Sequence, residues 1–139
     1  MNNCLILDGK EVAQISSESL TARVKKLNNH GRPPKLVAIL VGDDSASATY
    51  VAMKERACHS LGIETEIKRL KKDTSTTELQ QIIKDLNNDQ TVDGILLQHP
   101  VPKQIDEIKC FNTICIEKDV DGVTSEGFGN MAMGLNAFG

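Results

Sequence analysis

Two short runs of apolar residues stand out from an otherwise amphipathic chain. Residues 36–41 read Leu-Val-Ala-Ile-Leu-Val, and residues 92–98 read Val-Asp-Gly-Ile-Leu-Leu-Gln. Short apolar runs rich in β-branched residues are typical of strands buried on both faces. Between them, residues 63–70 alternate apolar and charged side chains, which predicts a half-exposed strand at a sheet edge. The apolar stretch 4–7 predicts a further small strand or extended arm.

Apolar residues at helical spacing predict helices between and beside these strands. The expected ranges are 10–27, 45–61, 74–88 and 105–114, the last with Asp106 near its start. Ser75 and Glu78 form a capping-box pattern at the start of the third helix. Ser45 or Ser47 is expected as the N-cap of the second helix, and Gly62 suits the position after its end.

Strands that alternate with helices predict an α/β fold of three layers, in which helices flank a mainly parallel sheet. The chain of 139 residues is long enough for one domain with its own core. After a charged loop at 117–123, the tail to residue 139 is weakly patterned.

The composition of the chain argues against several classes of function. A net charge of −3 gives no basic field for nucleic acid. The four cysteines lack a C-x-x-C pair and the three histidines are scattered, so no metal site is expected, and reduced cysteines are typical of a cytosolic protein. Neither a signal-peptide pattern nor a long apolar run is present, so we expect no secretion signal and no membrane span.

A polar stripe lies on the helix that follows the first buried strand. Ser47, Tyr50 and Lys54 fall at positions i, i+3 and i+7, which places them on one helix face. A lysine and a tyrosine on a helix are most often surface residues, but most of this helix is apolar. Because burial disfavours the charged form, a partly desolvated Lys54 could act as a general acid or base near neutral pH.

Two further polar groups are expected beside that stripe. Gln98 ends the second buried strand, where Pro100 and Pro102 stop the sheet, and Asp119 and Asp121 lie in the charged loop. In a parallel sheet all of these lie at the carboxyl edge, where open α/β sheets bind ligands. The residues alone therefore indicate a small-molecule site with a candidate lysine acid/base.

Three matches to known functional motifs are rejected because their surroundings in the sequence do not fit. Residues 127–132 fit G-x-G-x-x-A, but no clear strand leads into them and too few residues follow for a dinucleotide-binding unit. Tyr50-x-x-x-Lys54 fits the catalytic pair of short-chain dehydrogenases, but no glycine-rich phosphate loop precedes it. Asp43 and Asp44 have no third metal ligand, so a turn is the better interpretation.

Three segments, in order and in spacing, resemble the signatures of the methylenetetrahydrofolate dehydrogenase/methenyltetrahydrofolate cyclohydrolase family. They are V-G-D-D-x-A-S-x-x-Y-x-x-x-K at 41–54, D-G-I-L-L-Q-H-P-V-P-K-Q-I-D at 93–106 and K-D-V-D-G at 118–122, and the likeness includes Asp8-Gly9-Lys10. The resemblance implies a bifunctional enzyme of one-carbon metabolism. Such an enzyme passes hydride from methylenetetrahydrofolate to NADP and hydrolyses the resulting methenyltetrahydrofolate to formyltetrahydrofolate.

The resemblance also implies residue roles. Lys54 would be the acid/base of the cyclohydrolase step, Tyr50 would stack on the folate, and Gln98 would position the lysine. Ser47 would support that cluster, Pro100 would contact substrate, and Asp121 would hold the pterin ring. Three departures from the family pattern are Ser45 in place of proline, His99 in place of leucine and Asn130 in place of arginine.

On this resemblance, 1–139 is expected to be a folate-binding catalytic domain like the N-terminal domain of amino-acid dehydrogenases. Residues 123–139 would lead into an absent nucleotide-binding domain that holds NADP or NAD, and without it dehydrogenase activity should be negligible. The intact protein is expected to be a cytoplasmic homodimer that serves purine and amino-acid biosynthesis and uses no metal. Two alternatives stay open: an inactive folate-binding module, and the substrate domain of another two-domain dehydrogenase.

Overall fold

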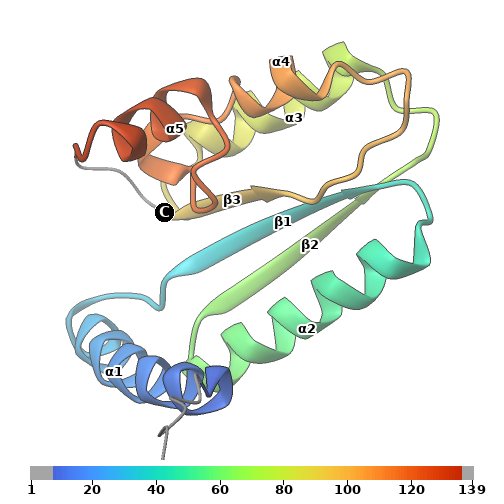
Figure 1. Cartoon of the computed structure of the whole chain (residues 1–139). Coiled ribbons are helices and arrows are strands. Elements are labelled where there is room, and N and C mark those ends of the chain that lie inside the picture. Colours follow the sequence, from blue (N-terminus) through green and yellow to red (C-terminus); the bar gives the residue numbers. More distant parts are fainter. Residues whose placement is uncertain (1–7, 136–139) are drawn as a thin grey trace, which may run out of the picture.

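A parallel sheet between two helical layers forms the centre of the molecule, as the computed structural model of residues 8–135 shows (Figure 1). Its three strands are β1 (Lys35–Val41), β2 (Glu64–Leu70) and β3 (Gly94–Leu97), in the order β2-β1-β3 and all parallel. The predicted α/β fold and the edge position of the second strand are confirmed. The arm expected at 4–7 lies outside the described residues.

The central strand β1 carries the core on both of its faces. Val37, Ile39 and Val41 pack with the helices of one layer, whereas Ala38 packs with Val51 of the opposite layer. All of these side chains are at most 2% exposed. The continuous apolar run therefore corresponds to a strand covered on both faces, as its pattern predicts.

Helix α2 (Ser45–Leu61) covers one face of the sheet. Its N-cap is Asp44, whose Oδ1 accepts the backbone N–H of Ser47 at 2.7 Å, so the prediction of Ser45 or Ser47 as N-cap is wrong. A carboxylate also interacts favourably with the positive end of the helix dipole. The predicted role of Gly62 is confirmed: it has φ 81° and follows the last turn.

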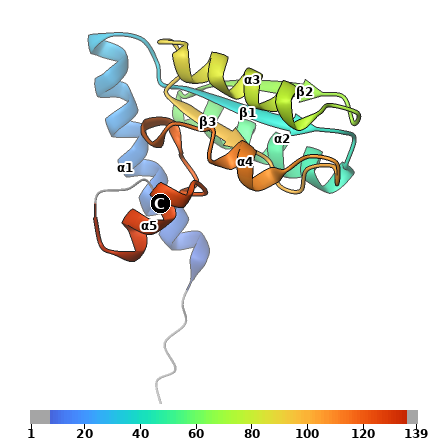
Figure 2. The ribbon, with the colours of Figure 1, turned by 90° about the horizontal axis from the view of Figure 1, so that it is seen from above.

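Helices α3 (Thr76–Asn88) and α4 (Glu107–Phe111) cover the other face, as Figure 2 shows from above. The capping box of Ser75 and Glu78 is present. The helix expected at 105–114 is shorter than predicted, because Asp106 caps its start and the chain leaves the helix at Asn112.

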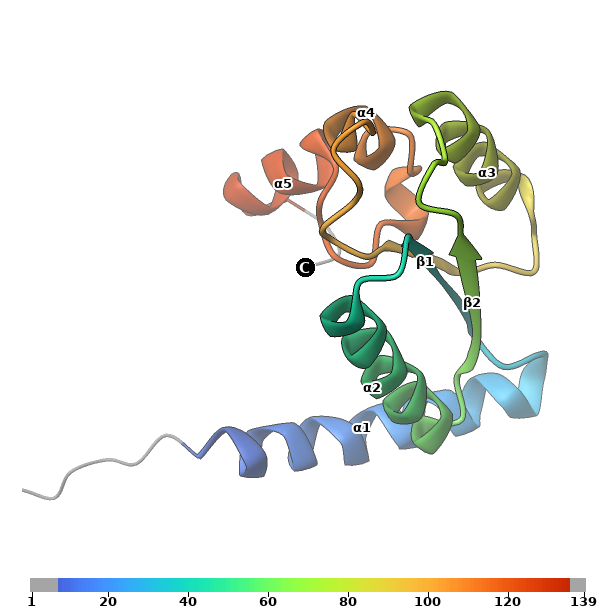
Figure 3. The ribbon, with the colours of Figure 1, turned by 90° about the vertical axis from the view of Figure 1, so that its right-hand side faces the viewer.

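Helix α1 (Gly9–His30) crosses the end of α2 and projects past the body of the molecule (Figure 3). Its amphipathic pattern predicts the helix correctly. However, Val24 is 5% exposed whereas Val12 is 64% and Leu27 is 55% exposed. No helix among residues 8–135 is long and apolar enough to cross a bilayer.

The tail contains elements that its weak pattern does not predict. The 3-10 helix η1 (Ile116–Lys118) and helix α5 (Ser125–Ala132) follow α4. The Thr124 hydroxyl caps α5 by accepting the N–H of Gly127 at 2.9 Å. Gly134, with φ 68°, follows its end.

Candidate functional site

Lys54 of α2 and Asp121 of the loop after η1 meet at the carboxyl edge of the sheet. Lys54 Nζ lies 3.9 Å from Asp121 Oδ2, and their side chains are 42% and 46% exposed. A half-exposed ion pair at this distance contributes little to stability. Both charged groups are therefore open to a ligand, and two residues expected to share a site lie together.

The other two residues of the α2 stripe differ sharply in exposure. Tyr50, one turn before Lys54, is 61% exposed, whereas Ser47 is 2% exposed. Tyr50 presents an aromatic surface large enough to stack on a planar ligand. Ser47 is buried, so a ligand at this edge would contact the Tyr50 side chain more readily than the Ser47 side chain.

Gln98 leaves β3 at the same edge. Its backbone N–H donates to the Ile39 carbonyl at 2.9 Å, which continues the ladder of β1 and β3. Its Nε2 donates to the His99 carbonyl at 2.8 Å, while its buried Oε1 has no partner among the described residues. Because buried acceptors are nearly always paired, this amide oxygen is available to a donor from a ligand or a rearranged Lys54.

Pro100 is exposed and lies in the turn after Gln98, where the His99–Pro100 peptide is cis. With Pro102 and Gly42 it lines a hollow of about 370 Å³ at the end of β1. In the sequence, the neighbouring His99 is notable only as a departure from the family pattern. In the structure its Nδ1 lies 2.7 Å from Glu107 Oε1, which ties the turn to α4.

Asp119 shares a polar loop with Asp121 but has a different environment. It is 1% exposed, and its carboxylate accepts the backbone N–H groups of Val123 at 3.1 Å and Thr124 at 2.9 Å. Its backbone also bridges to Ile95 of β3. Asp119 therefore shapes the loop that presents Asp121. The sequence signal for this role is an aspartate shortly before a glycine in a turn, because such aspartates hydrogen-bond nearby backbone groups.

An apolar hollow of about 560 Å³ opens beside Asp121. Phe111 of α4 and Phe128 and Met131 of α5 are among its lining residues. An aromatic and apolar surface next to a carboxylate is suited to a flat organic ligand that carries polar groups at one end.

The described residues do not form a cradle for a dinucleotide. The G-x-G-x-x-A match at 127–132 lies within α5, and no strand of residues 8–135 leads into it. Gly127 is instead required by packing, since a Cβ there would lie 2.8 Å from Asp119 Oδ2. Residues 8–135 also contain no group of three side chains placed to hold a metal ion.

Proteins of known sequence resemble this chain over nearly all of its length. It is 55% identical over 131 residues to the bifunctional protein FolD of Shouchella clausii, covering 94% of this chain and 47% of that protein. It is 53% identical over 138 residues to FolD of Saccharophagus degradans, covering 99% and 49%. The chain thus spans about half the length of these relatives.

Solved structures also resemble this chain over nearly all of its length. The crystal structure of the bifunctional methylenetetrahydrofolate dehydrogenase/cyclohydrolase FolD from Campylobacter jejuni matches with a TM-score of 0.91 and 36% identity, over 94% of this chain and 47% of that one. FolD from Trypanosoma brucei, complexed with NADP and an inhibitor, matches with a TM-score of 0.89 and 28% identity, over 99% and 47%. The family model described as tetrahydrofolate dehydrogenase/cyclohydrolase, catalytic domain, matches residues 7–121. The chain therefore belongs to the tetrahydrofolate dehydrogenase/cyclohydrolase family and carries its catalytic domain.

Proposed function

We propose that this domain binds a tetrahydrofolate derivative at the carboxyl edge of the sheet and hydrolyses methenyltetrahydrofolate to formyltetrahydrofolate. The observation that carries the proposal is the approach of Lys54 Nζ to Asp121 Oδ2, at 3.9 Å, on an open edge that also holds the exposed ring of Tyr50. An amine, a carboxylate and an aromatic face match the reacting bridge, the polar pterin edge and the flat rings of such a substrate.

In the proposed step, water adds to the electrophilic bridge carbon of the methenyl cation. Lys54 accepts a proton from that water, which leaves a neutral carbinolamine. One C–N bond then breaks as the carbinolamine hydroxyl proton passes to the departing nitrogen, and the formyl group stays on the other nitrogen. An amine that is neutral when the substrate is bound can act as general base.

Five other side chains would hold the substrate and orient the reacting groups. Tyr50 would stack on the folate rings, and Asp121 would accept hydrogen bonds from N–H groups of the pterin. The buried Oε1 of Gln98, unpaired among the described residues, would accept a hydrogen bond from Lys54 and hold it toward the bridge. Pro100 would contact the substrate from the turn after β3, and Ser47 would support the cluster from the buried side of α2.

We further propose that the intact protein oxidises methylenetetrahydrofolate with NADP. The described residues do not fit a dinucleotide, so NADP would be held by residues outside 8–135. For residues 8–135 alone we therefore expect no dehydrogenase activity.

We also propose that the intact protein is a cytoplasmic homodimer that needs no metal. Its formyl product would supply purine and amino-acid biosynthesis. Sedimentation of the intact protein at micromolar concentration should give a single species of twice the chain mass, and a monomer would refute the dimer.

The test of the proposed function is the loss of methenyltetrahydrofolate absorbance with the intact protein and with Lys54→Ala. We expect turnover to disappear in the variant while the melting temperature changes little, because Lys54 is 42% exposed. Lys68→Ala is the matched control, since Lys68 is 36% exposed and pairs with Glu66 at 3.0 Å away from the site. Folate binding without turnover in the unaltered protein would indicate a binding module instead.

A further inference from the structure

The ammonium group of Lys118 donates all of its hydrogen bonds to the carboxyl end of α3, a helix that carries none of the site residues. Its Nζ lies 2.8 Å from each of three backbone carbonyl oxygens, those of Leu86, Asn87 and Asp89. These are carbonyls of the last turn of α3 and of its C-cap. An ammonium group has three N–H donors, so each donor has one acceptor.

This arrangement fits the needs of the helix end. The last four carbonyls of an α-helix have no partner within the helix, and they form the negative end of its dipole. A cation that donates to them satisfies both the hydrogen bonds and the charge. Lys118 is therefore held in place and is not free to contact substrate.

The next two residues after Lys118 are each held by contacts of their own. Asp119 bridges to β3 and accepts two backbone N–H groups of the loop. Val120 lies so close to Gly94 that a Cβ on that glycine would be 2.6 Å from Val120 Cγ1. Asp121, next in the chain, meets Lys54 only at 3.9 Å.

Asp121 thus depends on its neighbours for its position. Its carboxylate is 46% exposed and weakly paired, so its own contacts do not fix it. The anchors at 118–120 join it to the end of α3 and to the first residues of β3, Gly94 and Ile95, at the other end of that strand from Gln98. A shift of the carboxylate of about 1 Å is enough to impair a positioned polar contact.

We propose that Lys118 is a positioning residue that acts through Asp121: by clamping the loop to the carboxyl end of α3, it holds the Asp121 carboxylate where the substrate binds. The identity of the substrate rests on the proposed function. The clamp itself rests only on the contacts of Lys118.

The test is a double-mutant cycle in the intact protein with Lys118→Met, which keeps the length of the side chain but removes its donors, and Asp121→Asn. Lys118→Met should raise the KM for methenyltetrahydrofolate about tenfold with little change in kcat, a split that reports lost substrate binding. In the Asp121→Asn background, Lys118→Met should raise KM less than about twofold, because residues that act through one contact are not additive. Equal rises in both backgrounds would overturn the proposal.

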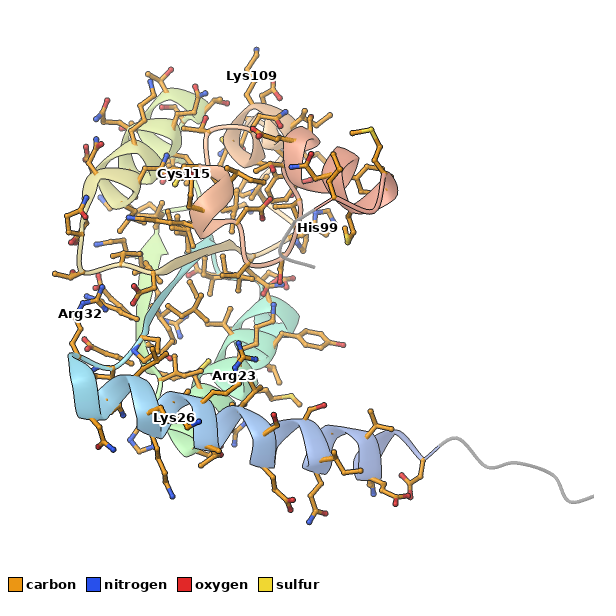
Figure 4. The ribbon with its side chains drawn as sticks, turned by 90° about the vertical axis from the view of Figure 1, so that its left-hand side faces the viewer. Arg23, Lys26, Arg32, His99, Lys109 and Cys115 are labelled. Atoms are coloured by element: carbon orange, nitrogen blue, oxygen red, sulfur yellow. The ribbon has the colours of Figure 1, made fainter. Side chains whose placement is uncertain are left out.

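Arg32→Met is the matched control for a purely structural effect. Arg32 also donates to a backbone carbonyl near the end of α3, that of Gln90, and to Asp93, at 2.9 and 3.0 Å. Figure 4 shows Arg32 on the side of the molecule opposite His99 and the substrate edge. This variant should lose thermal stability as Lys118→Met does, with KM unchanged; a matching rise in KM would count against positioning by Lys118. Lys118→Arg, which keeps donors, should restore most of the affinity.

A second readout separates this proposal from the proposed function. Lys118→Met should speed hydrogen exchange of the Val123 and Thr124 amides about tenfold relative to Arg32→Met, because these N–H groups bond to Asp119. If the unaltered protein binds no tetrahydrofolate derivative, the proposed function fails, and unchanged exchange would still overturn the clamp independently.

Discussion

Asp119 and Asp121 are separated by one residue yet have opposite surroundings. Asp119 is 1% exposed and accepts two backbone N–H groups, whereas Asp121 is half exposed and faces Lys54. The sequence assigns both to one polar loop because it cannot distinguish two aspartates in the same turn. The distinction arises from the backbone bridge of Asp119 to β3, which directs one carboxylate inward.

Asp119→Asn should therefore destabilise the protein by about 1–3 kcal/mol, since an amide can accept only one of the two N–H groups well and leaves a buried donor unpaired. Urea denaturation at neutral pH measures the change. Asp121→Asn is the matched substitution at an exposed position and should alter stability by less than about 0.5 kcal/mol. Equal losses in the two variants would mean that Asp119 does not hold the loop.

Helix α5 contains two glycines with different surroundings. At Gly127 an added Cβ would lie 2.8 Å from Asp119 Oδ2 and 2.9 Å from Thr124 Oγ1, whereas at Gly129 nothing lies within 4 Å. The first glycine is required by close packing at the helix start. The second only lowers the intrinsic stability of the helix.

The two alanine variants should thus change the melting temperature in opposite directions. Gly127→Ala should lose about 1–3 kcal/mol through overpacking, which outweighs the gain of about 1 kcal/mol in helix propensity. Gly129→Ala should gain about 0.5–1 kcal/mol because no contact opposes it. A stabilising Gly127→Ala would show that Asp119 and Thr124 move aside at little cost.

The same glycines explain why α5 is absent from the sequence prediction. Helix α5 has eight residues, two of them glycine, so helical periodicity and propensity are both weak over its length. Helix α3 is predicted well because its capping box and buried Leu79, Ile83 and Leu86 agree with each other. For α1 the pattern predicts the helix but not its surroundings, because periodicity does not say what a helix packs against.

At the scale of the molecule, the parallel sheet brings the site together. Lys54 and Asp121 come from separate segments, and the rule that parallel strands share a carboxyl edge is enough to predict that they lie near each other, as they do at 3.9 Å. The place of Gln98 beside Lys54 stays a prediction. Their three-dimensional details do not follow from that rule. The burial of Ser47 beside the exposed Tyr50 depends on how α2 is rotated against the sheet, which sequence spacing alone does not fix.

The acid limit of stability should depend on carboxylates that are hydrogen-bonded in the fold. The side-chain hydrogen bond from Arg32 lowers the pKa of Asp93 below its usual 3.8, and those from Lys35 and Lys68 lower the pKa of Glu66. Asp93 and Glu66 bind protons more tightly in the unfolded chain than in the folded protein. Their stabilisation is therefore present above the usual pKa, and it is lost as the pH falls through the lower pKa of the folded protein. Asp93→Asn should unfold more easily at pH 7, and its difference from the unaltered protein should shrink below about pH 4. A difference that stays constant from pH 7 to pH 2 would contradict the linkage.

The alkaline limit should involve Cys110, which is fully buried in the core and whose pKa burial raises from 9.0 to about 11. Below pH 9 the thiol is neutral in both states, and its packing contributes fully. Between pH 9 and 11 the unfolded thiol ionises first, so the free energy of unfolding falls as pH rises through this range. Cys110→Ala should be less stable at pH 8 by about 1 kcal/mol, through a small cavity, and in urea denaturation this difference should shrink and then change sign as the pH rises from 9 to 11. Parallel curves over that range would show that the thiol does not set the alkaline limit.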